Sequence, residues 1–216
     1  MGIGDAIAPA ARVALVGLAK NTGKTVALGA ILAELEARGE TIGVTSIGRD
    51  GEATDALDDA IAKPPILLPA MALVATTAPL LERSGARAEV VVRTGHRTPL
   101  GRVVVARLLE RGTVEVAGPT AVDDVAEVVE TMRSLGAARV LVDGSIDRRA
   151  GASPRLADGV VMSTGAVLSA DLDQLARRTK AAAELMTLPA VADGAVHARA
   201  AALSSSALLL DDGSAL

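Results

Sequence analysis

The residues with the clearest chemical potential are those from Gly17 to Thr25, which read GLAKNTGKT. A glycine-rich turn ahead of a helix binds phosphate because consecutive backbone N–H groups converge there and the helix N-terminus attracts anions. The usual spacing places four residues between the first glycine and Gly-Lys-Ser/Thr, whereas five residues, Leu18 to Thr22, intervene here. The segment therefore predicts a nucleotide-binding loop with one additional residue, in preference to an ordinary strand-to-helix turn.

The residues of this loop have separate expected roles. The lysine that ends such a loop reaches the β- and γ-phosphates and the following threonine ligates Mg²⁺, which assigns these roles to Lys24 and Thr25. The chain lacks the Asn-Lys-x-Asp signature of guanine recognition, so we expect ATP rather than GTP. The expected nucleotide-binding residues are Gly17, Lys20, Asn21, Thr22, Gly23, Lys24 and Thr25.

Acidic residues at the ends of expected strands complete a candidate magnesium site. Asp143 ends the apolar stretch VLVD, where an acid can hold Mg²⁺ through water. Asp50, in GRDGE, should lie beside the γ-phosphate, where it ligates Mg²⁺ or orients the attacking water, and Glu52 is the next candidate. The alternative for Asp143 is a helix-cap or turn aspartate, and the alternative for Asp50 is a plain turn aspartate beside Gly51. The metal candidates are Thr25, Asp50 and Asp143, and the catalytic candidates are Lys24, Asp50 and Asp143.

Further charged residues, Asp147, Arg148 and Arg149, follow Asp143 closely. An arginine at this place can stabilise charge on a transferring phosphoryl group. A solvated loop is the alternative interpretation of the same residues.

The elements that must position these residues follow an α/β pattern. Apolar spacing predicts a buried strand over Arg12 to Val16, a helix over Thr25 to Arg38 and a strand over Thr41 to Thr45. Strand, helix, strand is a βαβ unit, which implies a parallel sheet and a right-handed crossover. We therefore expect one α/β domain over residues 1–216, with a mainly parallel sheet flanked by helices.

A β-rich stretch at about residues 64–118, either an insertion or an extension of the sheet, interrupts this pattern. Within it, LLERGTVEVAG predicts a hairpin that turns at Arg111-Gly112. The predicted short strands are Ile66–Leu68, Leu73–Thr76, Ala88–Arg93, Arg102–Leu109 and Thr113–Val116.

The α/β pattern returns at Thr120, a predicted N-cap for a helix that runs to about Leu135 with Asp123 and Asp124 in its first turn. ARVLVDGS and GVVMSTG then predict two buried strands, followed by an amphipathic helix over Asp171 to Met186. The tail SSSALLLDDGS is either a last edge strand or a frayed end.

Composition excludes several kinds of site. The chain has no Cys, Phe, Tyr or Trp, which rules out a disulfide, a thiolate nucleophile, a cysteine-ligated zinc and an aromatic ring that stacks on a base. His96 and His197 lack metal-ligand spacing and are expected to be ordinary loop or surface residues. A net charge of −4 without a basic run argues against nucleic-acid binding.

No secretory signal or membrane span is expected from the sequence. The segment Met1 to Arg12 lacks a basic start followed by an apolar core. No apolar run approaches the roughly 20 residues that span a bilayer. The expected location is the cytoplasm.

Several motifs together resemble one family of P-loop proteins, the lysine 5,6-aminomutase reactivase subunit, which is the partner of a MutS-like subunit. The similarity runs from about Arg12 to Pro189. The motifs are VGLAKNTGKT, TSIGRDGEATDAL, KPPILLP with LVATTAPLL, TPLGRVVVARL with GTVEVAGP, LVDGSIDRRAGASP, and DGVVMSTGAVLS.

The resemblance implies a cytoplasmic P-loop ATPase that uses Mg²⁺ and ATP to reactivate an adenosylcobalamin-dependent aminomutase. ATP hydrolysis would drive the conformational change that releases damaged cobalamin. The motifs at Gly17 to Thr25, at Asp50 and at Asp143 carry over to this chain. The chain departs from the family in having no aromatic residue, although aromatic residues commonly anchor protein interfaces.

The spacing of the loop also resembles that of dethiobiotin synthetase and of the MinD-like ATPases, some of which dimerise across the nucleotide. Their signature lysine lies five residues before the motif lysine, whereas Lys20 lies four before Lys24, so both a role at a homodimer interface and a solvated lysine stay open. Two other functions remain as alternatives. One is an ATP-dependent small-molecule ligase, also indicated by Lys63-Pro64, and the other is a nucleotide-binding module without turnover.

Overall fold

The computed structural model describes residues 2–48, 65–144, 155–187 and 194–202. The chain divides into two compact units, Met1–Thr179 and Lys180–Leu216. Among the described residues, no helix is both long and apolar enough to cross a membrane.

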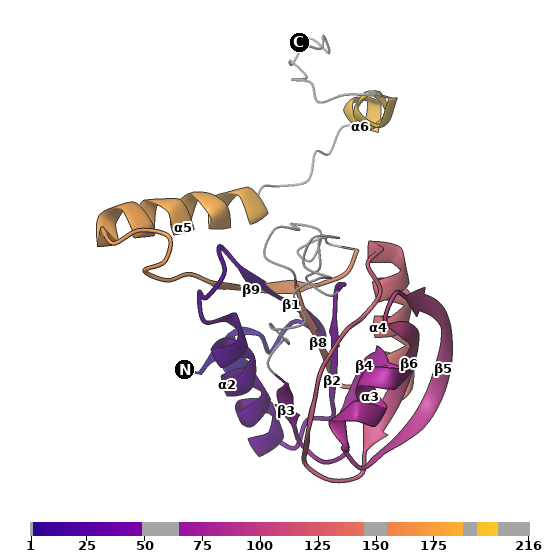
Figure 1. The fold of residues 1–216 in the computed structure, drawn as a ribbon. Coiled ribbons are helices and arrows are strands. Elements are labelled where there is room, and N and C mark those ends of the chain that lie inside the picture. Colours follow the sequence, from indigo (N-terminus) through magenta and orange to yellow (C-terminus); the bar gives the residue numbers. More distant parts are fainter. Residues whose placement is uncertain (1, 49–64, 145–154, 188–193, 203–216) are drawn as a thin grey trace. The chain divides into compact units, whose positions relative to one another are not determined.

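The first unit is built around a seven-stranded sheet with the strand order β5-β6-β4-β2-β8-β1-β9 (Figure 1). The strands from β4 to β9 in this order are parallel, while β6 is antiparallel to β4 and β5 is antiparallel to β6. The strands are β1 (Arg12–Gly17), β2 (Ile42–Ser46), β4 (Leu73–Thr77), β5 (Ala88–Thr98), β6 (Gly101–Leu108), β8 (Arg139–Asp143) and β9 (Gly159–Ser163). The predicted α/β fold with a mainly parallel sheet is confirmed.

Helices cover the two faces of this sheet (Figure 1). The helices of the first unit are α1 (Ile3–Ala6), α2 (Lys24–Ala37), α3 (Ala78–Ser84) and α4 (Val122–Ser134). Helix α5 (Leu172–Met186) runs from the first unit into the second, and α6 (Gly194–Ala202) belongs to the second unit. Apolar residues at helical spacing face the sheet, namely Leu28, Ile31, Leu32 and Leu35 of α2 on one side and Val125, Val128, Val129 and Met132 of α4 on the other. Because side chains alternate along a strand, β1 sends Val13 and Leu15 into the α2 core, and β4 sends Leu73 and Ala75 into the α4 core.

The β-rich segment extends the main sheet and also forms a small second sheet. Its hairpin consists of β5 and β6, which turn at Pro99 and Leu100. The predicted hairpin at Arg111-Gly112 is wrong, because β7 (Gly112–Val114) pairs with β3 (Ile66–Leu68) instead of with β6. The pairing with β3 buries Val114 in the α2 core, a long-range contact that the local turn signal does not reveal.

Two further expectations need correction. Helix α4 begins at Val122 with Ala121 in the N-cap position and no side-chain cap, so Thr120 is not the cap, although Asp123 and Asp124 do lie in the first turn. Strand β9 lies at the edge of the sheet and is only partly buried, whereas a buried strand was expected. The tail SSSALLLDDGS lies outside the described residues.

The outer strand β5 is irregular where it pairs with β6. Its register shifts twice, between Val90 and Val92 and again between Arg93 and Arg97. Such bulges bend a strand and increase its twist.

Candidate phosphate-binding site

The candidate site lies where neighbouring parallel strands end. Strand β1 ends at Gly17 and β8 ends at Asp143, and Leu15 of β1 is in register with Asp143. Because parallel strands end on the same edge of a sheet, the loop that follows β1 and the end of β8 lie at the same edge (Figure 1). The carboxylate of Asp143 contacts Lys24, the first residue of α2, at this edge. Ligands of open α/β sheets commonly bind at this carboxyl edge.

The loop from Leu18 to Gly23, called here the α2 loop, is fixed at both ends. The N–H of Leu18 donates to the carbonyl of Ser163 on β9 over 3.0 Å. The buried hydroxyl of Thr22 donates to the carbonyl of Ala19 over 3.0 Å and closes the turn from within. These bonds hold the loop against the sheet edge before α2 begins.

Two glycines have specific steric roles in the α2 loop. A Cβ on Gly17 would lie 2.8 Å from Oγ1 of Thr22, which is closer than side-chain contacts allow. Gly23 caps α2 with φ of 86°, a left-handed conformation that favours glycine. Asn21 also has positive φ, at 62°, which asparagine adopts more readily than most residues. The loop therefore needs the residue types that the sequence places there.

The backbone of the α2 loop presents unused donors. Within the part of the chain that the structure describes, the N–H groups from Ala19 to Val26 donate no hydrogen bond. The first N–H groups of any helix lack intrahelical partners, but here the free donors extend back through the preceding turn. A run of free amides at the positive end of a helix attracts an anion.

Lys24 is held directly beside Asp143. Its Nζ lies 3.0 Å from Oδ1 of Asp143 and also donates to the carbonyl of Gly144. The two side chains are only 12% and 6% exposed. The N–H of Gly144 in turn donates to the carbonyl of Leu15 over 2.9 Å, which ties the end of β8 to β1. The ammonium group is thereby fixed at the carboxyl edge of the sheet by β8.

The other predicted site residues are distributed as follows. Lys20, Asn21, Gly23 and Thr25 are exposed around the α2 loop, while Gly17 and Thr22 are buried in it. Asp50, Glu52, Asp147, Arg148, Arg149 and Lys63-Pro64 lie outside the described residues. The structure thus brings Lys24 and Asp143 into contact.

Metal-ligating side chains do not cluster in the described residues, where no group of three or more His, Asp or Glu side chains is placed to hold a metal ion. His96 lies on strand β5 rather than in a loop, and its side chain is 17% exposed. Its Nε2 lies 3.2 Å from Glu127 and its Nδ1 lies 3.6 Å from Asp124, both on α4. His96 therefore links β5 to α4. His197 belongs to α6.

A supporting residue that the sequence did not indicate is Ser46, the last residue of β2. Its buried hydroxyl accepts the N–H of Gly118 over 3.2 Å and lies 3.0 Å from the carbonyl of Gly48. Ser46 is in register with Asp143, and the N–H of Ile47 donates to the carbonyl of Asp143. Ser46 thus stabilises the strand end next to the site. A hydroxyl residue that ends a buried strand is the only signal for it in the sequence.

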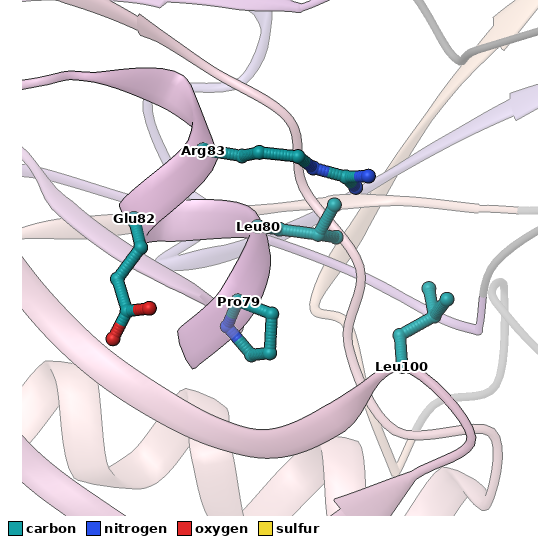
Figure 2. A pocket seen from close by; sticks show the side chains of 5 residues that line it. All are labelled: Pro79, Leu80, Glu82, Arg83 and Leu100. Atoms are coloured by element: carbon teal, nitrogen blue, oxygen red, sulfur yellow. The ribbon is translucent and has the colours of Figure 1, made fainter.

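Two surface hollows are formed by described residues of the first unit. One, of about 370 Å³, lies between α3 and the β5–β6 turn (Figure 2). In this view Arg83 and Leu80 extend from α3 towards the side of Leu100, whereas Glu82 points away from them. The second hollow, of about 190 Å³, runs beside α2 and includes Thr25. Of the described residues that line these two hollows, Thr25 is the one predicted site residue, and it lines the second hollow.

Comparisons with protein-family models, with curated proteins and with solved structures found no match.

Proposed function

We propose that this chain binds Mg²⁺-ATP at the α2 loop and hydrolyses it. The observation that carries the proposal is the position of Lys24, whose ammonium group is held by Asp143 and the carbonyl of Gly144 at the mouth of a loop with free N–H groups. A lysine, a carboxylate and a run of free amides are the groups that a triphosphate with a metal ion needs. The proposal includes the assignment of the α2 loop as a P-loop.

The residues present fit both the phosphates and the metal ion. The free N–H groups and Lys24 would hold the β- and γ-phosphates, because the amides present partial positive charge and Lys24 a full positive charge at the same edge of the sheet. The hydroxyl of Thr25 and the carboxylate of Asp143 would hold Mg²⁺, Asp143 through water. The bound Mg²⁺ supplies charge neutralisation of the triphosphate.

The Lys24–Asp143 pair suggests how the protein's own groups respond to the nucleotide. A buried ion pair is stable only while each charge keeps a partner. Transfer of Lys24 from Asp143 to a phosphate would remove one positive charge from beside the carboxylate, and Mg²⁺ that arrives with the nucleotide would replace that charge. We therefore expect ATP with Mg²⁺ to be favoured over ATP alone.

The biological role rests on the sequence resemblance. We infer an accessory ATPase that acts with a MutS-like partner on an adenosylcobalamin-dependent aminomutase. A tightly held, inactivated cofactor leaves an enzyme only if another process supplies the free energy that opens the enzyme. Nucleotide hydrolysis at the α2 loop would supply that free energy.

Calorimetric titration of the full-length protein with Mg²⁺-ATP tests the proposal. We expect Lys24→Ala to weaken binding by at least about tenfold, because a charge-assisted contact is lost. Lys180→Ala is the control, since Lys180 is an exposed lysine of α5 that is not among the expected nucleotide-binding residues, and we expect less than about threefold change. Unchanged affinity in Lys24→Ala would show that the nucleotide site is elsewhere. Stimulation of phosphate release by the aminomutase and its partner tests the accessory role separately.

A further inference from the structure

The second hollow follows the exposed side of α2 away from the α2 loop. Thr25, Gly29, Ala33 and Glu36 recur at helical spacing and line one wall over about 16 Å, at 1.5 Å rise per residue. We call this hollow the α2 groove. Its lining residues are Thr25, Gly29, Leu32, Ala33, Glu36, Pro65, Ile66, Leu67, Pro69 and Arg111.

The walls of the α2 groove are apolar between its two polar ends. Gly29 and Ala33 leave space on the helix side, where a Cβ built on Gly29 meets no atom within 4 Å. The opposite wall consists of β3 and the prolines that flank it, and Leu67 remains 50% exposed there. An apolar occupant gains free energy by covering this surface at roughly 25 cal/mol per Å².

The size of the groove limits the occupant. Its volume of about 190 Å³ lies below the roughly 300 Å³ at which pockets for drug-sized ligands begin. Because this volume is spread along about 16 Å of helix, the groove fits an extended alkyl chain better than a ring system.

Arg111 gives the far end of the groove a defined charge. Its Nη2 donates to both carboxylate oxygens of Glu36 over 2.5 Å. Its Nε and Nη1 make no hydrogen bond within the described ranges, so these donors remain for a second carboxylate. Glu36 orients the guanidinium and accepts from its Nη2 with both oxygens. The end of the groove therefore offers the remaining guanidinium donors of Arg111 to an anionic group.

We propose that the α2 groove binds a short-chain aliphatic carboxylate, with its carboxylate on Arg111 and its alkyl chain along α2 towards Thr25. General attraction of anions does not account for such binding, because the chain has a net charge of −4. The site itself stands independently of the nucleotide. Its coupling to ATP rests on the proposed function, since Thr25 lies at the other end of the groove and is the expected magnesium ligand.

Titration of the full-length protein with octanoate tests the proposal, with octanol and octylamine as probes of the same chain length. We expect octanoate to bind at least about tenfold more tightly than either, because only a carboxylate pairs with Arg111. Arg111→Gln should remove that difference. Equal binding of octanol and octanoate to the unchanged protein would overturn the proposal, as would failure of octanoate to bind at about 1 mM.

A pair of matched variants locates the ligand. Gly29→Leu fills the groove from an exposed helix position and should abolish octanoate binding. Ala30→Leu adds the same bulk at the next exposed position of α2, which does not line the groove, and should leave octanoate binding unchanged. Octanoate binding that survives Gly29→Leu would overturn the assignment.

The same samples separate this inference from the proposed function. Titration with Mg²⁺-ATP should change the affinity for octanoate by about fivefold or more, and octanoate should change the affinity for Mg²⁺-ATP by the same factor. If octanoate binds and ATP does not, the nucleotide proposal fails and the carboxylate site stands. If both bind without mutual effect, the coupling is wrong.

Discussion

The ammonium nitrogen of Lys24, the first residue of α2, lies 3.0 Å from Oδ1 of Asp143, the last residue of β8. This contact joins two segments that are far apart in the sequence, because β8 is inserted in the sheet between β1 and β2. Asp143 therefore has two expected tasks, neutralising Lys24 before the nucleotide binds and holding Mg²⁺ afterwards. The two tasks can be separated experimentally.

Asp143→Asn should spare nucleotide binding and reduce hydrolysis. ATP without Mg²⁺ should bind the variant at least as tightly as it binds the unchanged protein. In the variant, Lys24 can move to a phosphate without breaking an ion pair with residue 143. Phosphate release with Mg²⁺ should fall by at least about tenfold. Asp5→Asn, which removes a carboxylate exposed on α1, should change neither quantity. Hydrolysis at the original rate in Asp143→Asn would reduce Asp143 to a structural residue.

Gly17→Ala should disrupt the α2 loop. The added methyl group would lie 2.8 Å from Oγ1 of Thr22 and 3.2 Å from the carbonyl of Ala19, so it forces the buried hydroxyl out of place. We expect a loss of about 1–3 kcal/mol in the free energy of unfolding, together with weaker ATP binding. Gly29→Ala is the control, since no atom lies within 4 Å of its Cβ. It should be neutral or stabilising by up to about 1 kcal/mol. Equal urea midpoints for the two variants would contradict the crowding at Gly17.

Sequence patterns were most informative where the evidence for an element was local. The β1–α2–β2 unit follows from apolar periodicity and from the glycines that flank the helix. Helix α3 was missed although Pro79 lies in its first turn and Gly85 ends it with φ of 64°. Helix α3 has only 7 residues, too few for the spacing of its apolar residues to be distinguished from that of a short strand.

Pairing between distant segments was the part that sequence could not provide. The partner of β7 is β3 and not β6, because burial of Val114 decides the pairing over the local turn signal. The same holds for the site. The residue types of Lys24 and Asp143 made both of them candidates, but only the strand order brings them together. Gly144 and Ser46 contribute a carbonyl and a hydroxyl at strand ends, which no sequence motif marks.

Arg139→Met should destabilise the fold strongly. The guanidinium of Arg139 is almost fully buried and donates to the carbonyls of Ile7 and Ala10, and its Nη2 lies 3.0 Å from Glu40. The variant leaves these acceptors without a partner, at a cost of about 3–5 kcal/mol in the free energy of unfolding. Urea denaturation measures this cost. Arg38→Met removes an exposed ion pair with Asp5 and should cost less than about 1 kcal/mol. Similar losses in both variants would show that burial of Arg139 contributes little.

The contact between Arg12 and Asp158 should make stability depend on pH. The guanidinium of Arg12 donates to Asp158 and lowers the pKa of that carboxyl group below its ordinary value. A lowered folded-state pKa gives stability that is present above the unfolded pKa of about 3.9 and is lost as pH falls through the folded value. Urea midpoints of the unchanged protein and of Asp158→Asn should differ near neutral pH and converge in acid, below about pH 4. A difference that persists unchanged in acid would assign the effect to packing.

The two register shifts in β5 bear on how the protein behaves in concentrated solution. A long, regular outer strand would offer its free amides and carbonyls to the matching strand of another molecule and start open-ended association. The register shifts at Val90–Val92 and Arg93–Arg97 interrupt that template, and Arg93 and Arg97 are exposed along the same strand. We therefore expect the irregular pairing of β5 to oppose edge-to-edge association of the protein in concentrated solution.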